Sequence, residues 1–177
     1  MAESEILDVV DKDGNVIGKA PRSEIHQNPK LIHRVVHCWI FNNDGQVLWQ
    51  QRSMQKAQAP GMWDMSCGGH ILSGHEPDET LVREIEEELG ISNVIAHFVE
   101  KYIKGNNTQT ELIYLYYAVI NEPIERFTLQ KEEVERVEWI DIDKAMMMVV
   151  NKEREATNFI FTQVPRILQK IFRENQS

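Results

Sequence analysis

The pattern of apolar and polar residues predicts many short strands separated by a few helices. Residues 33–41 and residues 109–120 are nearly continuous apolar runs, which are typical of strands covered on both faces. Asn42–Gly45 is rich in residues that tolerate positive φ and predicts a hairpin turn. Gly68 and Gly69 are expected to end the strand that begins at Trp63. Shorter strands are expected at residues 5–10, 15–19, 46–52, 63–66, 94–103 and 134–140.

Helical segments alternate with these strands. Apolar spacing and terminal residues predict helices that start at Pro21 and that span residues 77–89, 141–152 and 156–173, the last one kinked or restarted at Pro165. Strands mixed with helices in this order predict an α/β fold in which helices cover a mixed sheet. A chain of 177 residues is expected to form one domain over residues 1–177. We expect a hairpin extension over about 1–29, a core over about 30–152 and a C-terminal helix over about 156–174.

Composition and net charge argue against some classes of binding partner. Lys and Arg number 19 and Asp and Glu number 28, so the formal charge is −9, which argues against binding a nucleic acid polymer. No apolar run of roughly 18 residues predicts a membrane span. The acidic start, residues 1–8, lacks the basic and apolar regions of a signal peptide. We therefore expect a cytoplasmic protein whose cysteines, Cys38 and Cys67, are free thiols.

The helix over 77–89 carries the most informative charges. Pro77 favours its first turn and Gly90 its end. Glu84, Glu87 and Glu88 fall within roughly a 100° arc that is expected to point mostly away from the apolar stripe. Such an arc is either a solvated acidic face or a site for a hard divalent cation, which would relieve the repulsion between the carboxylates. The stripe consists of Leu81, Val82, Ile85 and Leu89.

The residues around this helix resemble the conserved box of the Nudix family. Eight of the nine specified positions agree: Gly69, Arg83, Glu84, Ile85, Glu87, Glu88, Gly90 and Ile91. The resemblance implies an α/β/α sandwich with a mixed β-sheet and hydrolysis of a diphosphate bond in a nucleoside diphosphate linked to another group. It also implies Mg²⁺, or alternatively Mn²⁺, as the cofactor.

The resemblance assigns roles to these residues. Glu84, Glu87 and Glu88 would bind the metal, or one of them would deprotonate the attacking water. Arg83 would position the glutamates, and Gly69 would let the preceding loop fold against the helix beside the substrate. Because both the protein and a diphosphate are negatively charged, only a bridging cation makes their association favourable. Glu132 and Glu133 stand where the family sometimes supplies a catalytic base, and Arg52 and Lys56 are candidates for phosphate contacts.

One residue departs from the box. The first glutamate of the family pattern is replaced by His75, with Glu76 next to it. Imidazole is a poor ligand for Mg²⁺ and suits Zn²⁺ or Mn²⁺ better. The replacement leaves the metal stoichiometry and the catalytic rate open, and spacing alone does not decide which glutamate is the base.

Residues 33–70 also resemble type 1 isopentenyl-diphosphate isomerase. His26, His33 and His70 fall where that enzyme has metal-binding histidines, and Glu111 falls near one of its metal-binding glutamates. We expect His70 to touch metal and His33 and Glu111 to face the substrate. The isomerase needs a cysteine immediately before its Gly-His pair, but this position is Gly68, and Cys67 should point to the opposite face and act as a small buried apolar residue.

Three functions remain open at this point. A Nudix pyrophosphohydrolase acting on a small-molecule diphosphate, as in hydrolases similar to the isomerase but without the cysteine, fits the residues best. The alternatives are an isopentenyl-diphosphate isomerase and a non-catalytic diphosphate-binding module. A homodimer is possible, and no membrane partner is expected.

Overall fold

The computed structural model describes residues 5–174 and residue 176. Residues 1–4 of the acidic start and residues 175 and 177 lie outside this description. Within the described residues, no helix is both long and apolar enough to cross a bilayer.

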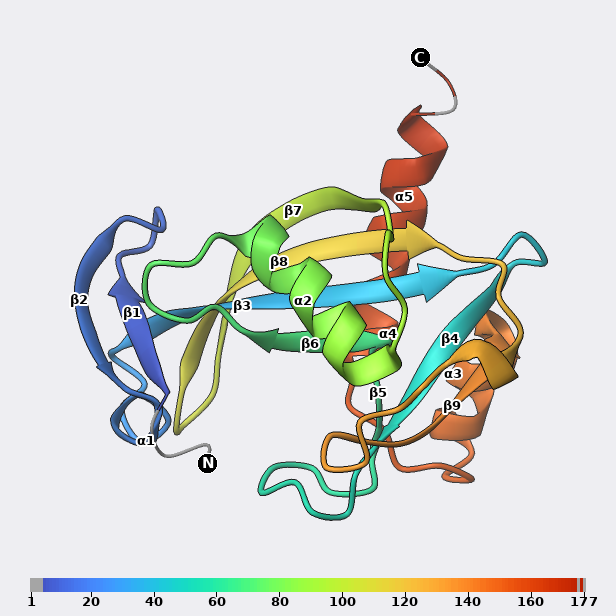
Figure 1. The fold of residues 1–177 in the computed structure, drawn as a ribbon, viewed down its shortest axis with the longest axis horizontal. Coiled ribbons are helices and arrows are strands. Elements are labelled where there is room, and N and C mark those ends of the chain that lie inside the picture. The colour runs from blue at the N-terminus through green and yellow to red at the C-terminus, as the bar shows by residue number, and fades with distance from the viewer. Residues whose placement is uncertain (1–4, 175, 177) are drawn as a thin grey trace.

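A long central strand, β3 (Ile32–Phe41), organises the sheet (Figure 1). Strand β8 (Thr110–Val119) pairs with it in parallel over its whole length, and β7 (Ala96–Gly105) pairs antiparallel with β8. On its other side β3 pairs with β6 (Cys67–His70) and, near its start, with β1 (Ile6–Val10). The remaining strands are β2 (Val16–Pro21), β4 (Gln46–Arg52), β5 (Trp63–Asp64) and β9 (Val134–Asp141).

Helices cover both faces of this mixed sheet. On one face, alternate β3 residues from Val36 to Ile40 pack against Leu81, Ile85 and Leu89 of α2 (Pro77–Leu89). On the other face, Trp39 and Phe41 pack against the C-terminal helices. Those helices are α3 (Ile142–Val150), α4 (Phe159–Thr162) and α5 (Val164–Glu174). The predicted α/β/α sandwich is therefore confirmed.

Most predicted elements agree with the structure, and the helix over 77–89 agrees to the residue. The helix predicted to start at Pro21 is only one turn long, α1 (Arg22–Ile25), and a short 3₁₀ helix spans Ile124–Arg126. The C-terminal helix restarts near Pro165, as predicted, because α4 ends at Thr162 and α5 begins at Val164.

The prediction that Gly68 and Gly69 end a strand was wrong, because both lie inside β6. Neighbouring atoms crowd both positions. A Cβ at Gly68 would lie 2.9 Å from the Val36 carbonyl oxygen, and one at Gly69 would lie 2.4 Å from the Glu84 carboxyl carbon. The glycines therefore permit close approach of β6 to β3 and α2 rather than interrupting the strand.

The β1–β2 hairpin is joined to the loop before α2 by a buried ion pair. Arg34 of β3 donates to Asp8 of β1 at 2.9 Å and to the His75 carbonyl at 3.1 Å. Asp8 also accepts from the Ser73 hydroxyl at 2.6 Å and from the Gly74 backbone at 3.1 Å. The loop that leads into α2 is thus held by residues of two strands (Figure 1).

Candidate active site

Two glutamates of α2, Glu84 and Glu88, lie against β6. Glu84 fills the space that the missing side chain of Gly69 leaves open. Glu88 is 5% exposed, and its Oε2 atom has no hydrogen-bond partner among the described residues. The glutamate arc was expected to point mostly away from the apolar stripe of α2, but Glu88 is nevertheless buried, beside Cys67 of β6. Glu87 remains exposed.

Burial makes these carboxyl groups difficult to ionise. It raises the pKa of Glu88 to about 8, with a further contribution from the neighbouring Glu84 carboxylate. Burial also raises the pKa of Glu84, which Arg83 partly offsets and Glu87 and Glu133 increase. Buried carboxylates that repel one another are stabilised by a cation, and an oxygen without a partner is a free ligand atom.

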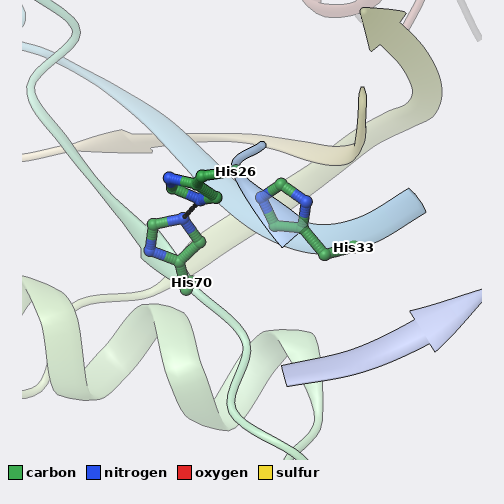
Figure 2. Close-up of side chains that lie close together, drawn as sticks. All are labelled: His26, His33 and His70. Carbon is green, nitrogen blue, oxygen red and sulfur yellow. Dashed lines mark hydrogen bonds between the residues drawn. The ribbon is translucent and has the colours of Figure 1, made fainter. Parts of the chain in front are cut away.

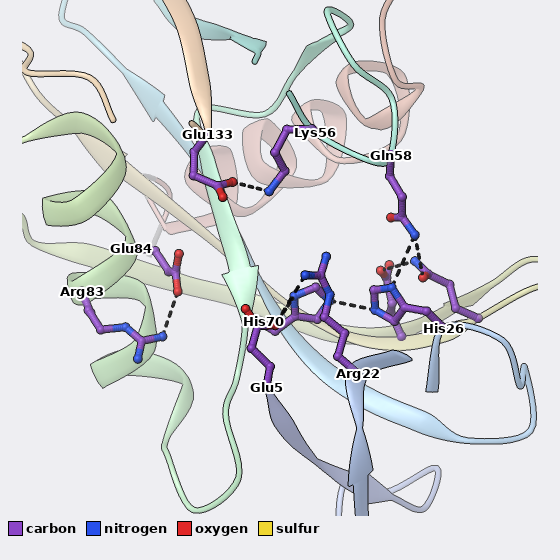
Figure 3. A network of polar contacts seen from close by, with 11 residues as sticks. Glu5, Arg22, His26, Lys56, Gln58, His70, Arg83, Glu84 and Glu133 are labelled. Carbon is purple, nitrogen blue, oxygen red and sulfur yellow. Dashed lines mark hydrogen bonds and ion pairs between the residues drawn. The ribbon is translucent and has the colours of Figure 1, made fainter. Parts of the chain in front are cut away.

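Two cationic side chains form ion pairs near these carboxyl groups, Arg83 with Glu84 and Lys56 with Glu133 (Figure 3). Arg83 donates to Glu84 Oε1 at 2.8 Å. Lys56, in the loop after β4, forms an ion pair with Glu133, which lies just before β9. The Lys56 ammonium group could exchange its carboxylate partner for a phosphate oxygen.

His75, the departure from the box, lies at the surface. Its side chain is 42% exposed, and its Nδ1 atom lies 3.8 Å from Glu79 Oε1. Its backbone carbonyl, in contrast, accepts the hydrogen bond from Arg34. The loop at this position is therefore held through the backbone, independently of the side chain at position 75.

We predict that His75→Glu changes kcat/KM by no more than about twofold, because a surface substitution usually alters free energies by less than about 0.5 kcal/mol. Steady-state kinetics on the preferred substrate measure this, with Glu79→Gln as the control for the surface pair. A gain of about tenfold would show that the side chain at position 75 reaches the site.

Three histidines form a second cluster of side chains (Figure 2). His26 follows α1, His33 lies on β3 and His70 ends β6, and their candidate ligand atoms all lie within 4.8 Å of one another. The Nε2 atoms of His26 and His70 are 3.0 Å apart. His33 is fully buried, and neither of its ring nitrogens has a hydrogen-bond partner in the described part of the chain. Neutral imidazoles that converge in this way are ligands for Zn²⁺ or Mn²⁺.

The environment of the cluster keeps all three rings neutral at pH 7. Burial lowers the pKa of His26 to about 4 and that of His33 to about 3. Burial also lowers the pKa of His70 well below its ordinary value, and His33, Arg22 and His26 lower it further. Metal binding therefore requires no proton to be removed from these rings.

Glu111 of β8 lies beside the cluster and outside the group of mutually close ligand atoms. It is opposite His33 in the parallel register, and its Oε1 atom accepts from Gln109 Nε2 at 2.8 Å. Burial raises the pKa of Glu111 to about 7, which Lys104 partly offsets. Glu111 can therefore hold or release a proton near neutrality.

Cys67 is buried as a free thiol, as predicted, and faces α2. Burial raises its pKa well above the ordinary value, and the nearby Glu88 carboxylate raises it further. A thiol in such an environment is a weak nucleophile and a weak acid.

The sequence did not reveal two other residues beside the site. Asp8 anchors the loop before α2 through bonds that only the folded chain brings together, and Gln58 reaches the histidine cluster from a polar loop. No local pattern distinguishes either residue from other surface Asp or Gln residues.

Comparison with known proteins identifies the family. The model of the NUDIX domain matches residues 31–161. The chain belongs to the Nudix family. An uncharacterized Nudix hydrolase of Clostridium acetobutylicum is 35% identical over 159 residues, covering 85% of this chain and 76% of that protein. Family membership supports the predicted enzyme class, a Nudix pyrophosphohydrolase, and members of this family generally use a divalent metal.

Isomerases are also among the relatives. An isopentenyl-diphosphate Delta-isomerase of Streptomyces avermitilis is 38% identical over 91 residues, which are 51% of this chain and 46% of that protein. The match covers less than half of the isomerase, so it confirms the predicted resemblance without extending to the whole enzyme.

Solved structures agree with the fold. A Deinococcus radiodurans protein, DR0079, superposes with a TM-score of 0.76 at 20% identity, covering 89% of this chain and 96% of that one. The NUDIX domain of Shewanella oneidensis NrtR, solved with ADP ribose, superposes with a TM-score of 0.62 at 14% identity, covering 78% and 87%. A small-molecule diphosphate is thus bound by one protein of this fold.

Proposed function

We propose that this protein is a metal-dependent hydrolase that cleaves the diphosphate bond of a nucleoside diphosphate linked to another group, or of a related organic diphosphate. The buried Glu88 carboxyl group, which lies next to Glu84 and the Cys67 thiol, carries the proposal. Its Oε2 atom has no hydrogen-bond partner among the described residues. A structural carboxyl group would be satisfied by a hydrogen bond, whereas a ligand for a cation must keep an oxygen free.

The residues fit Mg²⁺ or Mn²⁺. Glu84 and Glu88 would hold the ion, with Glu87 joining from the exposed side of α2. A bound divalent ion supplies neutralisation of phosphate charge and a more acidic water. Arg83 orients Glu84 through their 2.8 Å hydrogen bond, and Gly69 leaves the space in which Glu84 lies.

The other polar residues bind and orient the substrate. Lys56 meets phosphate oxygens once it exchanges its present partner, Glu133, while Arg83 stays bonded to Glu84. Glu133 is then released close enough to raise the pKa of Glu88, where it can accept a proton from water. Its position before β9 matches the place where the resemblance suggested a base.

The histidine cluster is proposed as a second cation site, with Zn²⁺ or Mn²⁺ as the matching ion. His33 supports it because its ring is fully buried and neither ring nitrogen has a hydrogen-bond partner within residues 5–174, which leaves an unmet bonding requirement. His26 and His70 complete a set of three imidazoles, and Glu111 faces the substrate beside them.

A phosphate-release screen tests the hydrolase. The panel contains nucleoside diphosphate sugars and alcohols, dinucleotides, nucleoside triphosphates, coenzyme A and isopentenyl diphosphate, each with Mg²⁺ and with Mn²⁺. We expect a metal-dependent product with wild type that is lost in Glu84→Gln and kept in Glu86→Gln, an exposed glutamate of the same helix. Silence across the panel from folded protein, or equal activity in both variants, would contradict the proposal.

The second candidate, an isopentenyl-diphosphate isomerase, is favoured by the histidine cluster and by Glu111. The position of the isomerase cysteine opposes it. A Cβ at Gly68 would lie 2.9 Å from the Val36 carbonyl oxygen and 3.0 Å from Met65 Sδ. The backbone here is too close to its neighbours to accept a cysteine without a local shift.

We predict that Gly68→Cys creates no isomerase activity and lowers the free energy of unfolding by about 1–3 kcal/mol, the usual cost of overpacking. NMR of isopentenyl diphosphate in D₂O detects the allylic product, and urea denaturation measures stability. Gly18→Cys is the control, because a Cβ there makes only an ordinary 4.0 Å contact with Val9. Isomerisation by the wild type or by Gly68→Cys would restore the second candidate.

A further inference from the structure

Gln58 contacts the histidine cluster from outside. It lies in the loop between β4 and β5, and Arg52 Nε donates to its backbone carbonyl at 3.2 Å. Its side-chain Nε2 atom lies 3.4 Å from His26 Nδ1, and His26 Nε2 faces His70 at 3.0 Å (Figure 3). Gln58 therefore touches the ring nitrogen that points away from the other histidines.

This 3.4 Å contact favours one tautomer of His26. In the present orientation of the Gln58 amide the nitrogen donates, so His26 Nδ1 accepts and carries no proton. The single proton of the neutral ring then lies on Nε2 and is donated to His70 Nε2 (Figure 2). In this arrangement the two nitrogens that face the centre of the cluster are occupied by one shared proton.

A cation in the cluster needs the opposite tautomer. Binding through His26 Nε2 requires a lone pair there, so the ring proton must move to Nδ1, with no proton gained or lost overall. The proton would then face the donor nitrogen of Gln58. Two N–H groups would then face and repel each other. If the Gln58 amide turns and presents its oxygen, that oxygen accepts a hydrogen bond from Nδ1–H and the repulsion is removed.

The amide of Gln58 is connected to further polar groups. Its Nε2 atom also donates to Gln109 Oε1 at 3.4 Å, and Gln109 donates to Glu111 at 2.8 Å. Both contacts of the Gln58 nitrogen are long, so they resist rotation weakly. A turn of the Gln58 amide would also alter the partners of Gln109 and, through it, of Glu111.

We propose that Gln58 is a positioning residue that decides which tautomer His26 adopts and so how tightly the cluster binds a cation. Its amide nitrogen holds the ring in the form that cannot bind through Nε2, and its amide oxygen holds the form that can. The inference rests on the second cation site proposed above and is independent of the glutamates on α2.

The test replaces the amide by a group that can only accept. Gln58→Glu is expected to bind Zn²⁺ about tenfold more tightly than wild type, within the range usual for partners of metal-binding histidines. Calorimetric titration with Zn²⁺ and with Mn²⁺, in excess Mg²⁺ to occupy the glutamates, measures the affinity. Gln55→Glu, an exposed change of equal charge in the same loop, is the control and should show less than about twofold change.

Nitrogen chemical shifts provide a second readout that a general charge effect would not move. We expect His26 to carry its proton on Nε2 in the metal-free wild type, and on Nδ1 after Zn²⁺ is added. In metal-free Gln58→Glu the proton should already lie on Nδ1. A wild-type ring protonated on Nδ1, or equal Zn²⁺ affinity in the two glutamate variants, would overturn the inference.

The hydrolase and this inference fail separately. Absence of Zn²⁺ and Mn²⁺ binding to the histidines would overturn the role of Gln58 and leave metal-dependent hydrolysis intact. Absence of hydrolysis would leave both the affinity difference and the tautomer measurement in place.

Discussion

Replacing Glu88 by Gln is expected to lower metal-dependent hydrolysis at least about 10²-fold and, at the same time, to stabilise the metal-free protein at alkaline pH. Activity should be lost because the substitution removes the most buried carboxylate of the three glutamates. Gain of stability follows because the neutral amide avoids the cost of ionising a buried acid beside Glu84 and Glu133. The matched control for both effects is Glu86→Gln on the exposed side of the helix.

The pH dependence gives this prediction its sign. The pKa of Glu88 is about 8 in the folded protein and has an ordinary value of 4.5, so between these values the folded state binds more protons than the unfolded state. The wild type therefore loses stability as pH rises through this window, by up to about 1.4 kcal/mol per pH unit from this group. Urea denaturation of metal-free protein from pH 5 to pH 9 should show Glu88→Gln diverging upward from wild type. Parallel curves, or a variant that becomes less stable at pH 9, would contradict the assignment.

Asp8→Ala is expected to lower the free energy of unfolding by about 3–5 kcal/mol, because it leaves Arg34 buried without its partner. The Ser73 hydroxyl and the Gly74 backbone lose their acceptor as well. Both members of the pair are largely buried, with side chains 5% and 8% exposed. Urea denaturation at pH 7 measures the loss.

The control for Asp8→Ala is an exposed ion pair. Arg166 and Glu100 lie 2.8 Å apart with side chains 46% and 39% exposed, so Glu100→Ala should cost less than about 1 kcal/mol. Burial raises the pKa of Asp8, but the Ser73, Gly74 and Arg34 contacts outweigh it and hold the pKa below its usual value of 3.8. The advantage of wild type over Asp8→Ala should therefore shrink as pH falls below about 4. Similar losses for the two alanine variants would show that the network does not stabilise the loop.

The stability of this network also concerns the site. Arg34 holds the His75 carbonyl and Asp8 holds Ser73 and Gly74, so the chain enters α2 from a loop fixed on two strands. The N-terminal hairpin is therefore part of the structure that places Glu84 and Glu88. Its removal would free the loop that precedes α2.

The sequence by itself determined the family, the sandwich and the helix that carries the glutamates. α2 begins at Pro77 and ends before Gly90, as predicted, because both residues act locally. Proline fixes φ at the start, and Gly90 adopts a φ of 68° at the end. The residues of the Nudix box are also close together in the sequence, so they could be aligned with the family pattern without knowledge of the rest of the chain. The histidines could be singled out only because their spacing resembles that of the isomerase.

Only the tertiary structure decided how these residues meet. The burial of Glu88 depends on β6 lying against α2, and that approach depends on two glycines whose neighbours come from β3 and α2. The convergence of His26, His33 and His70 joins a helix end and two strands, and the Asp8 and Gln58 contacts join segments far apart in the chain. Local pattern reports what neighbours along the chain prefer, whereas burial, pKa and ligand geometry arise from residues brought together by folding.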